Sequence, residues 1–264
     1  MHGKGVRLKR LFKHSRRLFI VPMDHGITVG PVEGLKDMGR TVKQVVGGGV
    51  DAVIVHKGLV GQITELLGPE GGELIVHLSA STAFAPAPNK KELISSVEHA
   101  IRLGATGVSV HVNLGDAHES QMLKDLGKVA EHCAFWGMPL LAMMYVRDGI
   151  EESEYDPAKI RHAARVAEEV GADIIKVNYT GSADTFAEVT RSVKVPVVIA
   201  GGPKLASTRD LLAMISNAIE AGAGGVALGR NVFQDRDPQL LAGKIRRVLD
   251  EQLSGEEIDE LIKL

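Results

Sequence analysis

One lysine in this sequence lies inside a run of apolar, β-branched residues, where burying a charge is energetically unfavourable. Lys176 lies in the run Ile174-Ile175-Lys176-Val177, and in an extended strand it shares a face with Ile174 and Asn178. A lysine between apolar walls loses the solvation of its ammonium, so its pKa falls and the amine becomes a nucleophile. The alternative is a lysine whose stem packs while its head reaches water or a carboxylate. We favour catalysis, because charged side chains are seldom buried without a use.

Two other side chains could move protons beside such an amine. Tyr145 is one of only three tyrosines and directly follows the apolar run 140–144. Its phenol can give and take a proton, but a tyrosine at a strand end is as often a packing residue. Asp24 follows Pro22, and its carboxylate suits either proton abstraction from a substrate hydroxyl or capping of the next turn. Lys57 is a weaker alternative nucleophile.

The elements that must position these residues recur along the whole chain. Short apolar runs appear at near-even spacing, and stretches of helical period lie between most of them, as in Ile160, Ala163, Ala164 and Ala167. Continuous apolar runs are typical of strands covered on both faces by helices. The predicted strands are Leu18 to Pro22, Ala52 to His56, Leu74 to Leu78, Gly107 to Val112, Leu140 to Met144, Ile174 to Val177, Val195 to Ala200 and Gly225 to Leu228.

A weak internal repeat favours closure of these strands into a barrel. Gly49-Val50, Gly104-Ala105, Gly171-Ala172 and Gly222-Ala223 stand just before the second, fourth, sixth and eighth predicted strands. A glycine in the left-handed conformation typically ends a helix. The motif recurs once for every two strands, and a doubly wound open sheet gives no reason for such a four-fold repeat. The 264 residues also match one barrel of about 250 residues. We predict an α/β fold, a single (β/α)8 TIM barrel over residues 1–264.

In such barrels the active site forms where the strands end, so strand ends seven and eight are informative. Gly201-Gly202 and Gly229-Arg230 follow those two strands, where barrels of this kind frequently bind phosphate through backbone amides and a helix N-terminus. Glycine lets the backbone approach the oxygens, and Arg230 can add a fork of donors. The position of these glycines predicts a phosphorylated substrate.

Four histidines at strand ends suggest a rival chemistry, a catalytic zinc site. They are His25, His56, His77 and His111, and three converging imidazoles can hold such a metal. The sequence contains neither a His-x-His nor a His-Glu-x-x-His spacing, and a strand-end histidine is more often a hydrogen-bonded wall residue. We therefore predict no metal and no other cofactor.

The composition of the chain limits which binding partners and which cellular location we expect. The chain carries 31 basic and 33 acidic side chains, a formal net charge of -2, so no global field draws it to nucleic acid or anionic lipid. It has no apolar run long enough to span a bilayer and no signal peptide. The single cysteine, Cys133, rules out an intramolecular disulfide. We expect a cytoplasmic enzyme that acts on small molecules.

Two segments lie outside the predicted barrel. The basic N-terminal extension, residues 1–17, could contact phosphate or nucleic acid, but its amphipathic pattern favours closing the lower end of the barrel or meeting a neighbouring subunit. A C-terminal helix is predicted over residues 254–264, where Ser254 and Glu257 have the spacing of a capping box. Barrels of this kind commonly associate, so we also expect a homo-oligomer.

Residues 20 to 234 resemble a known family, the archaeal-type class I aldolases, which include fructose-bisphosphate aldolases and heptulosonate synthases. Within it the chain is more similar to the heptulosonate synthases, because of His77-Leu78-Ser79, the segment Ala83 to Lys91, and Met143-Met144-Tyr145. The family motifs are carried here by Val21 to Gly26, His111 to Gly115, Met143 to Tyr145, Lys176 to Gly181, Gly201 to Lys204 and Gly229 to Phe233.

The resemblance implies roles for individual residues. Lys176 would form the Schiff base, Tyr145 would donate a proton and Asp24 would accept one. Where the family usually has proline after the tyrosine, this chain has Val146, which puts the loop geometry and the exact substrate in question. The implied substrate contacts are Asp24, His25, Gly26, Ile27, Thr28, Tyr145, Val146, Arg147, Gly201, Gly202, Gly229 and Arg230.

The resemblance also implies a reaction between a phosphorylated keto-sugar and an aldehyde. The expected activity is transfer of a fragment of 1-deoxy-D-threo-hexo-2,5-diulose 6-phosphate to L-aspartate 4-semialdehyde, giving a 2-amino-3,7-dideoxy-D-threo-hept-6-ulosonate on a route to 3-dehydroquinate. Alternatives with the same chemistry are cleavage of fructose 1,6-bisphosphate and aldol addition of glycerone phosphate to aspartate semialdehyde. Alternatives of another class are a zinc-dependent lyase and a non-catalytic phosphosugar-binding barrel.

Overall fold

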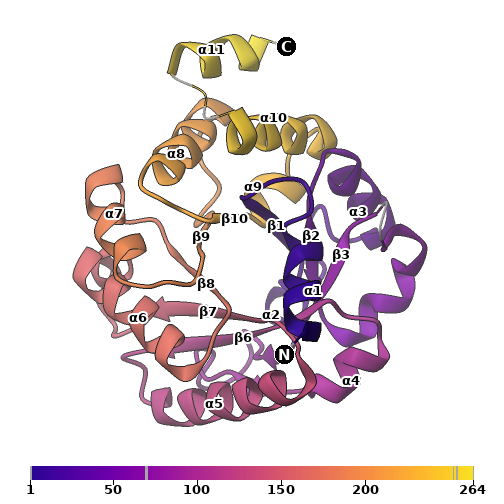
Figure 1. The fold of residues 1–264 in the computed structure, drawn as a ribbon, viewed down its shortest axis with the longest axis vertical. Helices are drawn as coiled ribbons and strands as arrows, with labels where there is room; N and C mark the ends of the chain where they lie inside the picture. Colours follow the sequence, from indigo (N-terminus) through magenta and orange to yellow (C-terminus); the bar gives the residue numbers. More distant parts are fainter. Residues whose placement is uncertain (1, 69–70, 252, 254, 264) are drawn as a thin grey trace.

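Eight parallel strands close into a barrel in a computed structural model that describes residues 2–68, 71–251, 253 and 255–263. Each strand pairs in parallel with its two neighbours, in the order β1-β10-β9-β8-β7-β6-β3-β2. Figure 1 looks along the axis of this ring. The strands are β1 (Leu18–Pro22), β2 (Ala52–Val55), β3 (Glu73–His77), β6 (Gly107–Leu114), β7 (Leu140–Val146), β8 (Ile174–Asn178), β9 (Val197–Ala200) and β10 (Gly225–Ala227).

All eight predicted strands are confirmed, and the differences lie at their ends. The fourth and fifth continue two residues further than predicted, because they pair with each other as far as Leu114 and Val146. The seventh begins at Val197 instead of Val195. Pro196 lies between, and it has no N–H group to donate to a neighbouring strand.

Most helices follow a strand, and α3 to α8 together with α10 form the outer ring in Figure 1. Their bounds are α1 (His2–Leu11), α2 (Gly26–Val29), α3 (Met38–Gly47), α4 (Val97–Arg102), α5 (Glu119–Trp136), α6 (Pro157–Val170), α7 (Ala183–Arg191), α8 (Thr208–Glu220), α9 (Arg230–Phe233), α10 (Pro238–Glu251) and α11 (Gly255–Lys263). Three 3-10 helices lie in loops: η1 (Lys57–Gln62), η2 (Thr64–Leu66) and η3 (Glu151–Tyr155). No described helix has both the length and the apolar character needed to cross a bilayer.

The helix ends follow directly from local sequence. In α6 the Asp156 side chain accepts a hydrogen bond from the Lys159 N–H, and Pro157 occupies the first turn, where its missing N–H costs nothing. The same helix ends at Gly171, whose φ of 107° is left-handed. The other three glycines of the predicted repeat, Gly49, Gly104 and Gly222, also have positive φ. The repeat therefore marks the turns that lead into alternate strands.

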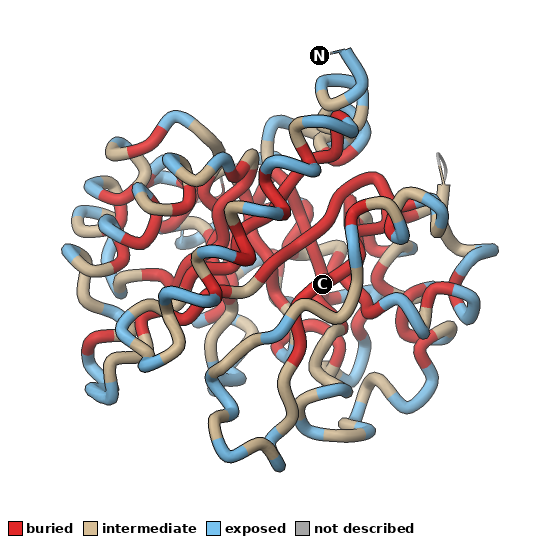
Figure 2. Tube along the Cα trace, turned by 90° about the horizontal axis from the view of Figure 1, so that it is seen from below, coloured by how far each residue is buried: buried red, intermediate tan, exposed pale blue. Residues whose placement is uncertain are grey.

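The barrel interior is a separate apolar core, and α1 closes one end of it. Leu8, Leu11 and Phe12 pack against inward-facing strand residues such as Leu18 and Ile174. Figure 1 shows α1 across the opening of the ring, and Figure 2 shows the barrel from the side, with the N-terminus at one end and partly exposed loops at the other. Of the two roles favoured for the basic extension, closure of the lower end matches this packing, and contact with a neighbouring subunit stays a prediction.

Charges at this closed end are paired within the chain. Asp51 is fully buried, accepts the Phe19 N–H at 2.7 Å and bonds to His14 and Arg246. Arg10 of α1 reaches the buried carboxylate of Glu73 at 2.8 Å. These contacts to the buried carboxylates of Asp51 and Glu73 tie the extension, the strands and α10 together, so Arg10 and His14 serve the fold.

One element of the fold was not predicted from the sequence. The sequence analysis missed a small antiparallel hairpin of β4 (Ser79–Ala80) and β5 (Glu92–Leu93), which follows β3 and encloses the loop 81–91. The C-terminal helix is present as α11, but Ser254, half of the predicted capping box, lies outside the described residues.

Candidate active site

A cavity of about 510 Å³ lies where the barrel strands end, opposite the end that α1 closes. Of the predicted site residues, its lining includes Asp24, His25, Thr28, Tyr145, Arg147, Lys176, Gly201, Gly202, Gly229 and Arg230. The remaining three, Gly26, Ile27 and Val146, do not line it: Ile27 points to solvent at 37% exposure, and the Val146 side chain is buried. Most of the predicted contacts are thus brought to one cavity.

Lys176 lies on the inner face of the barrel and shares that face with Ile174, as the strand alternation predicted. Ile174, two residues earlier, belongs to the interior core, and Lys176 pairs in register with Met143 of β7. Its side chain is only 7% exposed. Among the described residues its amine forms no hydrogen bond or close ion pair, although the charge of the Asp24 carboxylate acts on it from further away.

Asp24 lies at the end of β1 among nitrogen atoms. Its carboxylate oxygens lie 3.8 Å from His25 Nδ1 and 3.7 Å from His77 Nε2. Burial alone would raise the pKa of Asp24, but the neighbouring His77, His25 and Lys176 outweigh it and hold that pKa well below its usual range. The carboxylate is therefore ionised at neutral pH and can accept a proton.

His77 lies beneath Asp24 and is 3% exposed. Burial lowers its pKa to about 4, so the imidazole is neutral at pH 7. Its Nδ1 lies 2.7 Å from the hydroxyl oxygen of Ser109, which is completely buried. If the hydroxyl donates to Nδ1, the proton of the neutral ring is on Nε2, the atom that faces Asp24.

Tyr145 faces the cavity from β7, next to His111 of β6. The two ring centroids lie 4.9 Å apart at 45°. Asn113 donates its Nδ2 to the Asn89 carbonyl, so its Oδ1 accepts from His111 Nε2 at 2.9 Å. Burial lowers the pKa of His111 to about 3. The neutral ring therefore presents Nδ1 as an acceptor beside the Tyr145 phenol.

The glycine-bearing strand ends form one wall of the cavity. Asn231, in the first turn of α9, donates to the carbonyls of Gly201 and Pro203, which ties the loop after β9 to α9. Gly229 has a packing role that the sequence did not suggest. A Cβ there would lie 2.7 Å from His25 Cε1, so only glycine lets β10 end against His25.

A second group of charges lines the cavity and was missed as a group by the sequence analysis. Lys91 comes from the loop 81–91, where its amine donates to Ser81 Oγ at 2.5 Å. Arg147 follows β7 and forms an ion pair with Glu154 of η3, while Glu151 also lines the cavity. Only Arg147 was predicted. The other residues lie in loops, and the path of a loop cannot be read from hydrophobic periodicity.

The geometry of the histidines does not support the rival zinc site. No group of three or more His, Cys, Asp or Glu side chains within residues 2–68, 71–251, 253 and 255–263 is arranged to hold a metal ion. His77 Nδ1 is engaged by Ser109, and His111 Nε2 by Asn113. These two imidazoles are hydrogen-bonded wall residues.

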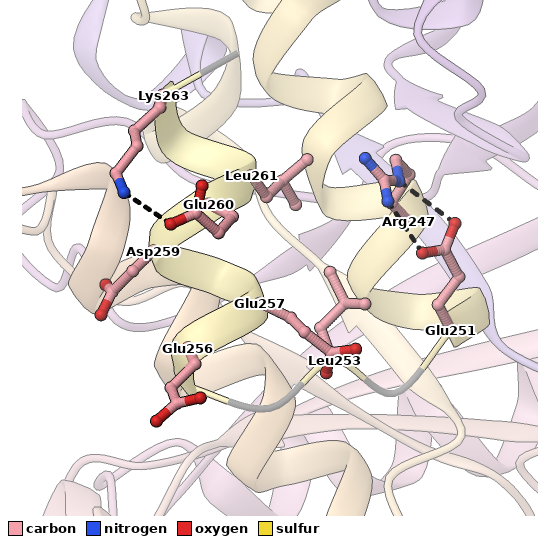
Figure 3. A pocket seen from close by; sticks show the side chains of 9 residues that line it. All are labelled: Arg247, Glu251, Leu253, Glu256, Glu257, Asp259, Glu260, Leu261 and Lys263. Atoms are coloured by element: carbon pink, nitrogen blue, oxygen red, sulfur yellow. Dashed lines mark hydrogen bonds and ion pairs between the residues drawn. The ribbon is translucent and has the colours of Figure 1, made fainter.

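Another hollow lies between α10 and α11, away from the strand ends (Figure 3). It is lined by many carboxylates, and several of them are already paired. Arg247 bonds to Glu251, and Lys263 to Glu260. Asp259 pairs with Arg209 of α8. The first two pairs lie within α10 and within α11, and the third joins α11 to α8, so these charges are satisfied by the helices themselves.

Comparison with known proteins gives one consistent result. Residues 18–235 match the DeoC/LacD family aldolase. A relative from Streptomyces griseus, named 2-amino-4,5-dihydroxy-6-oxo-7-(phosphonooxy)heptanoate synthase, is 46% identical over 92% of this chain and 89% of its own. A relative from Archaeoglobus fulgidus, named 2-amino-3,7-dideoxy-D-threo-hept-6-ulosonate synthase 1, is 44% identical over 98% of this chain and 96% of its own.

The solved structures agree with the sequence relatives. A Schiff-base-forming fructose-1,6-bisphosphate aldolase superposes with a TM-score of 0.85 at 30% identity, over 93% of this chain and 99% of its own. An archaeal fructose 1,6-bisphosphate aldolase superposes with a TM-score of 0.83, also at 30% identity, over 93% and 98% of the two chains. Together with a family match that runs from the first to the eighth barrel strand, these likenesses show that this protein is a class I aldolase of the DeoC/LacD aldolase family.

Proposed function

We propose that this enzyme forms a Schiff base on Lys176 and builds a seven-carbon 2-amino-6-oxo acid from a keto-sugar phosphate and L-aspartate 4-semialdehyde. The names of both relatives describe such a product, and they differ at carbon 7, which carries a phosphonooxy group in one and is deoxy in the other. In either product, carbons 1 to 4 match the semialdehyde and carbons 5 to 7 match a ketone donor. The bond that forms joins carbons 4 and 5.

The observation that carries the proposal is Lys176, a buried side chain on the wall of the cavity whose amine forms no hydrogen bond among the described residues. It shares the lining with the ionised Asp24 and with the Tyr145 phenol. A nucleophile, a proton acceptor and a proton donor are the groups that Schiff-base aldol chemistry needs. A non-catalytic phosphosugar-binding barrel would have no use for an unpaired lysine at this depth.

The reaction that we favour is a transaldol reaction. Lys176 adds to carbon 2 of 1-deoxy-D-threo-hexo-2,5-diulose 6-phosphate and loses water to form a protonated imine. Asp24 takes the proton of the carbon-4 hydroxyl, the bond between carbons 3 and 4 breaks, and its electrons form an enamine. The phosphorylated aldehyde fragment leaves. The retained three-carbon fragment is then ready for the second substrate.

The second half of the reaction reverses these events with a new aldehyde. The enamine carbon attacks the aldehyde carbon of L-aspartate 4-semialdehyde, and Tyr145 protonates the oxygen that becomes a hydroxyl. The proton that Asp24 took up in the first half is released to water, and water restores the proton of the Tyr145 phenol. Water then hydrolyses the imine and frees Lys176. The product is 2-amino-3,7-dideoxy-D-threo-hept-6-ulosonate. The glycine-bearing wall and Arg230 would hold the phosphate of the donor during the first half.

Trapping with borohydride tests the proposal and separates the donors. The enzyme is incubated with the diulose phosphate, glycerone phosphate or fructose 1,6-bisphosphate, reduced, digested and weighed by peptide mass spectrometry. We expect an adduct on the Lys176 peptide with the diulose phosphate, and neither adduct nor turnover in Lys176→Met. Adducts with only one of the other donors would favour the matching alternative reaction.

Three results would overturn this proposal. They are an adduct on another lysine, full activity of the Lys176→Met enzyme, or loss of activity to a chelator without any adduct. The last result would favour the histidine-dependent metal chemistry instead. The cytoplasmic location and the homo-oligomer expected from the sequence remain predictions.

A further inference from the structure

Besides Asp24, two further carboxylates line the cavity, although no donor substrate considered above carries a positive charge. Glu151 and Glu154 both belong to η3 and both line the same cavity as Lys176. A phosphosugar brings a dianion and neutral hydroxyl groups, which gain little from a carboxylate wall. A cationic group on the second substrate would explain why these carboxylates face the cavity.

Glu154 is held in place from several sides. Its carboxylate forms an ion pair with Arg147, and its carbonyl accepts the Asn178 amide at 3.1 Å. Lys159 of α6 bonds to Asp148 at 2.6 Å and to Ser153 in the middle of η3 at 2.5 Å, which ties this turn to α6. The Glu154 side chain is 23% exposed. It is therefore a positioned wall residue and not a solvated surface charge.

Arg147 connects this carboxylate to the proton donor. Its N–H donates to the Leu114 carbonyl at 2.7 Å, so the chain continues the course of β7 one residue past the end of the strand. Tyr145 and Arg147 therefore share a face, roughly 7 Å apart along the strand. The Arg147 guanidinium lies 5.6 Å from the centre of the Tyr145 ring.

The charges of this group are balanced. Lys91 and Arg147 are cations, and Glu151 and Glu154 are anions. A pocket with two charges of each sign complements a zwitterion, because an α-carboxylate can take the open side of a guanidinium while an α-ammonium donates to a carboxylate. A phosphate group, by contrast, is typically bound by cations and backbone amides without carboxylates.

We propose that Glu154, together with Arg147 and Lys91, forms the subsite for the α-amino-acid head group of the aldehyde acceptor. Glu154 accepts a hydrogen bond from the α-ammonium, and Arg147 and Lys91 hold the α-carboxylate. The aldehyde end then lies toward Tyr145 and Lys176. This inference rests on the proposed function and adds to it the residues that select an amino-acid aldehyde over a simple aldehyde.

The test compares two acceptors in one variant. L-Aspartate 4-semialdehyde and succinate semialdehyde differ only by the α-amino group. We expect Glu154→Gln to lower kcat/KM for the amino aldehyde by roughly 10- to 100-fold, as for loss of a hydrogen bond to a charged group, and to leave the succinate semialdehyde value nearly unchanged. Glu152→Gln is the matched control, because Glu152 is exposed on η3 and does not line the cavity.

Borohydride trapping with the donor alone, in each variant, makes the outcomes distinguishable. A normal donor adduct in Glu154→Gln with loss of only the amino aldehyde supports the subsite. A normal adduct with equal loss of both aldehydes, or with no loss, overturns the inference and leaves the proposed function standing. Absence of a donor adduct in the unmodified enzyme overturns the proposed function and this inference with it.

Discussion

At the residue scale, burial of His77 makes the stability of the protein depend on pH. Its pKa is about 4 in the folded protein, because desolvation disfavours the charged imidazole, whereas an unfolded chain has a value near 6.5. Below pH 6.5 the unfolded state therefore binds more protons than the folded state. The stabilising contribution is complete above that pH and is lost as the pH falls toward 4.

We predict a lower free energy of unfolding at pH 5 than at pH 7.5 in urea titrations. His77 alone accounts for about 2 kcal/mol between pH 6.5 and 5, at about 1.4 kcal/mol per pH unit. His111, with a pKa of about 3, adds to the loss in the same direction. His77→Gln cannot take up the proton, so its stability should depend less steeply on pH. An equal slope in both proteins would contradict the prediction.

The residues of the site divide into those that follow from strand alternation and those that do not. Lys176, Tyr145 and Asp24 could be predicted, because each lies in or directly after a strand whose end faces the cavity. Lys91 and Glu154 could not. The hairpin around the loop 81–91 and the turn of η3 depend on contacts such as Lys159 with Ser153, which no sequence period encodes.

At the element scale, α1 acts as a plug for the barrel. Leu11 is 1% exposed and belongs to the interior core together with Leu18 and Ile20. A leucine at such a position leaves a cavity when it is truncated, since the surrounding strands cannot collapse onto the gap. The plug lies at the end of the barrel opposite the active site, so its loss should affect stability and not chemistry.

Leu11→Ala is expected to lower the free energy of unfolding by about 2–5 kcal/mol. The kcat of the enzyme that remains folded should stay within about twofold, because Leu11 lies at the end of the barrel opposite the active site. Val6→Ala is the control, since Val6 is on the same helix and 60% exposed, and it should change stability by less than about 0.5 kcal/mol. Equal effects of the two substitutions would show that α1 does not close the barrel in solution.

The strands could be predicted almost completely from the sequence, whereas the hairpin of β4 and β5 could not. Each barrel strand buries both faces, so its apolar run is unbroken and easy to recognise. Ser79–Ala80 and Glu92–Leu93 are only two residues long and partly polar. Nothing in them differs from a loop, yet their pairing sets the course of the segment that delivers Lys91.

At the scale of the whole molecule, the contacts that close the barrel and the cavity that holds the catalytic residues lie at opposite ends. Asp51, Arg246 and α1 close one end, and the cavity opens at the other. This separation explains how relatives of about 30% identity keep the same barrel while their names describe other substrates. Changes in the loops can alter the acceptor without disturbing the strands that hold the lysine.

The exposed aromatic pair at the end of α5 offers a test of the expected homo-oligomer. Phe135 is 80% exposed and packs edge-on against Trp136, with ring centroids 5.1 Å apart. Arg7 of α1 donates to the Gly137 carbonyl at 2.8 Å, so α1 lies beside this pair. Exposed aromatic side chains are costly in water and are enriched where subunits meet.

We predict that sedimentation equilibrium gives a mass above that of one chain, and that Phe135→Ser lowers it toward the monomer. The aromatic pair would lose its larger exposed face, while buried contacts of α5 such as Leu126 remain. Phe84→Ser is the matched control, because Phe84 is 97% exposed but lies in the loop 81–91. If the control dissociates the oligomer and Phe135→Ser does not, subunits meet at the loop side, and the second copy would then border the active site.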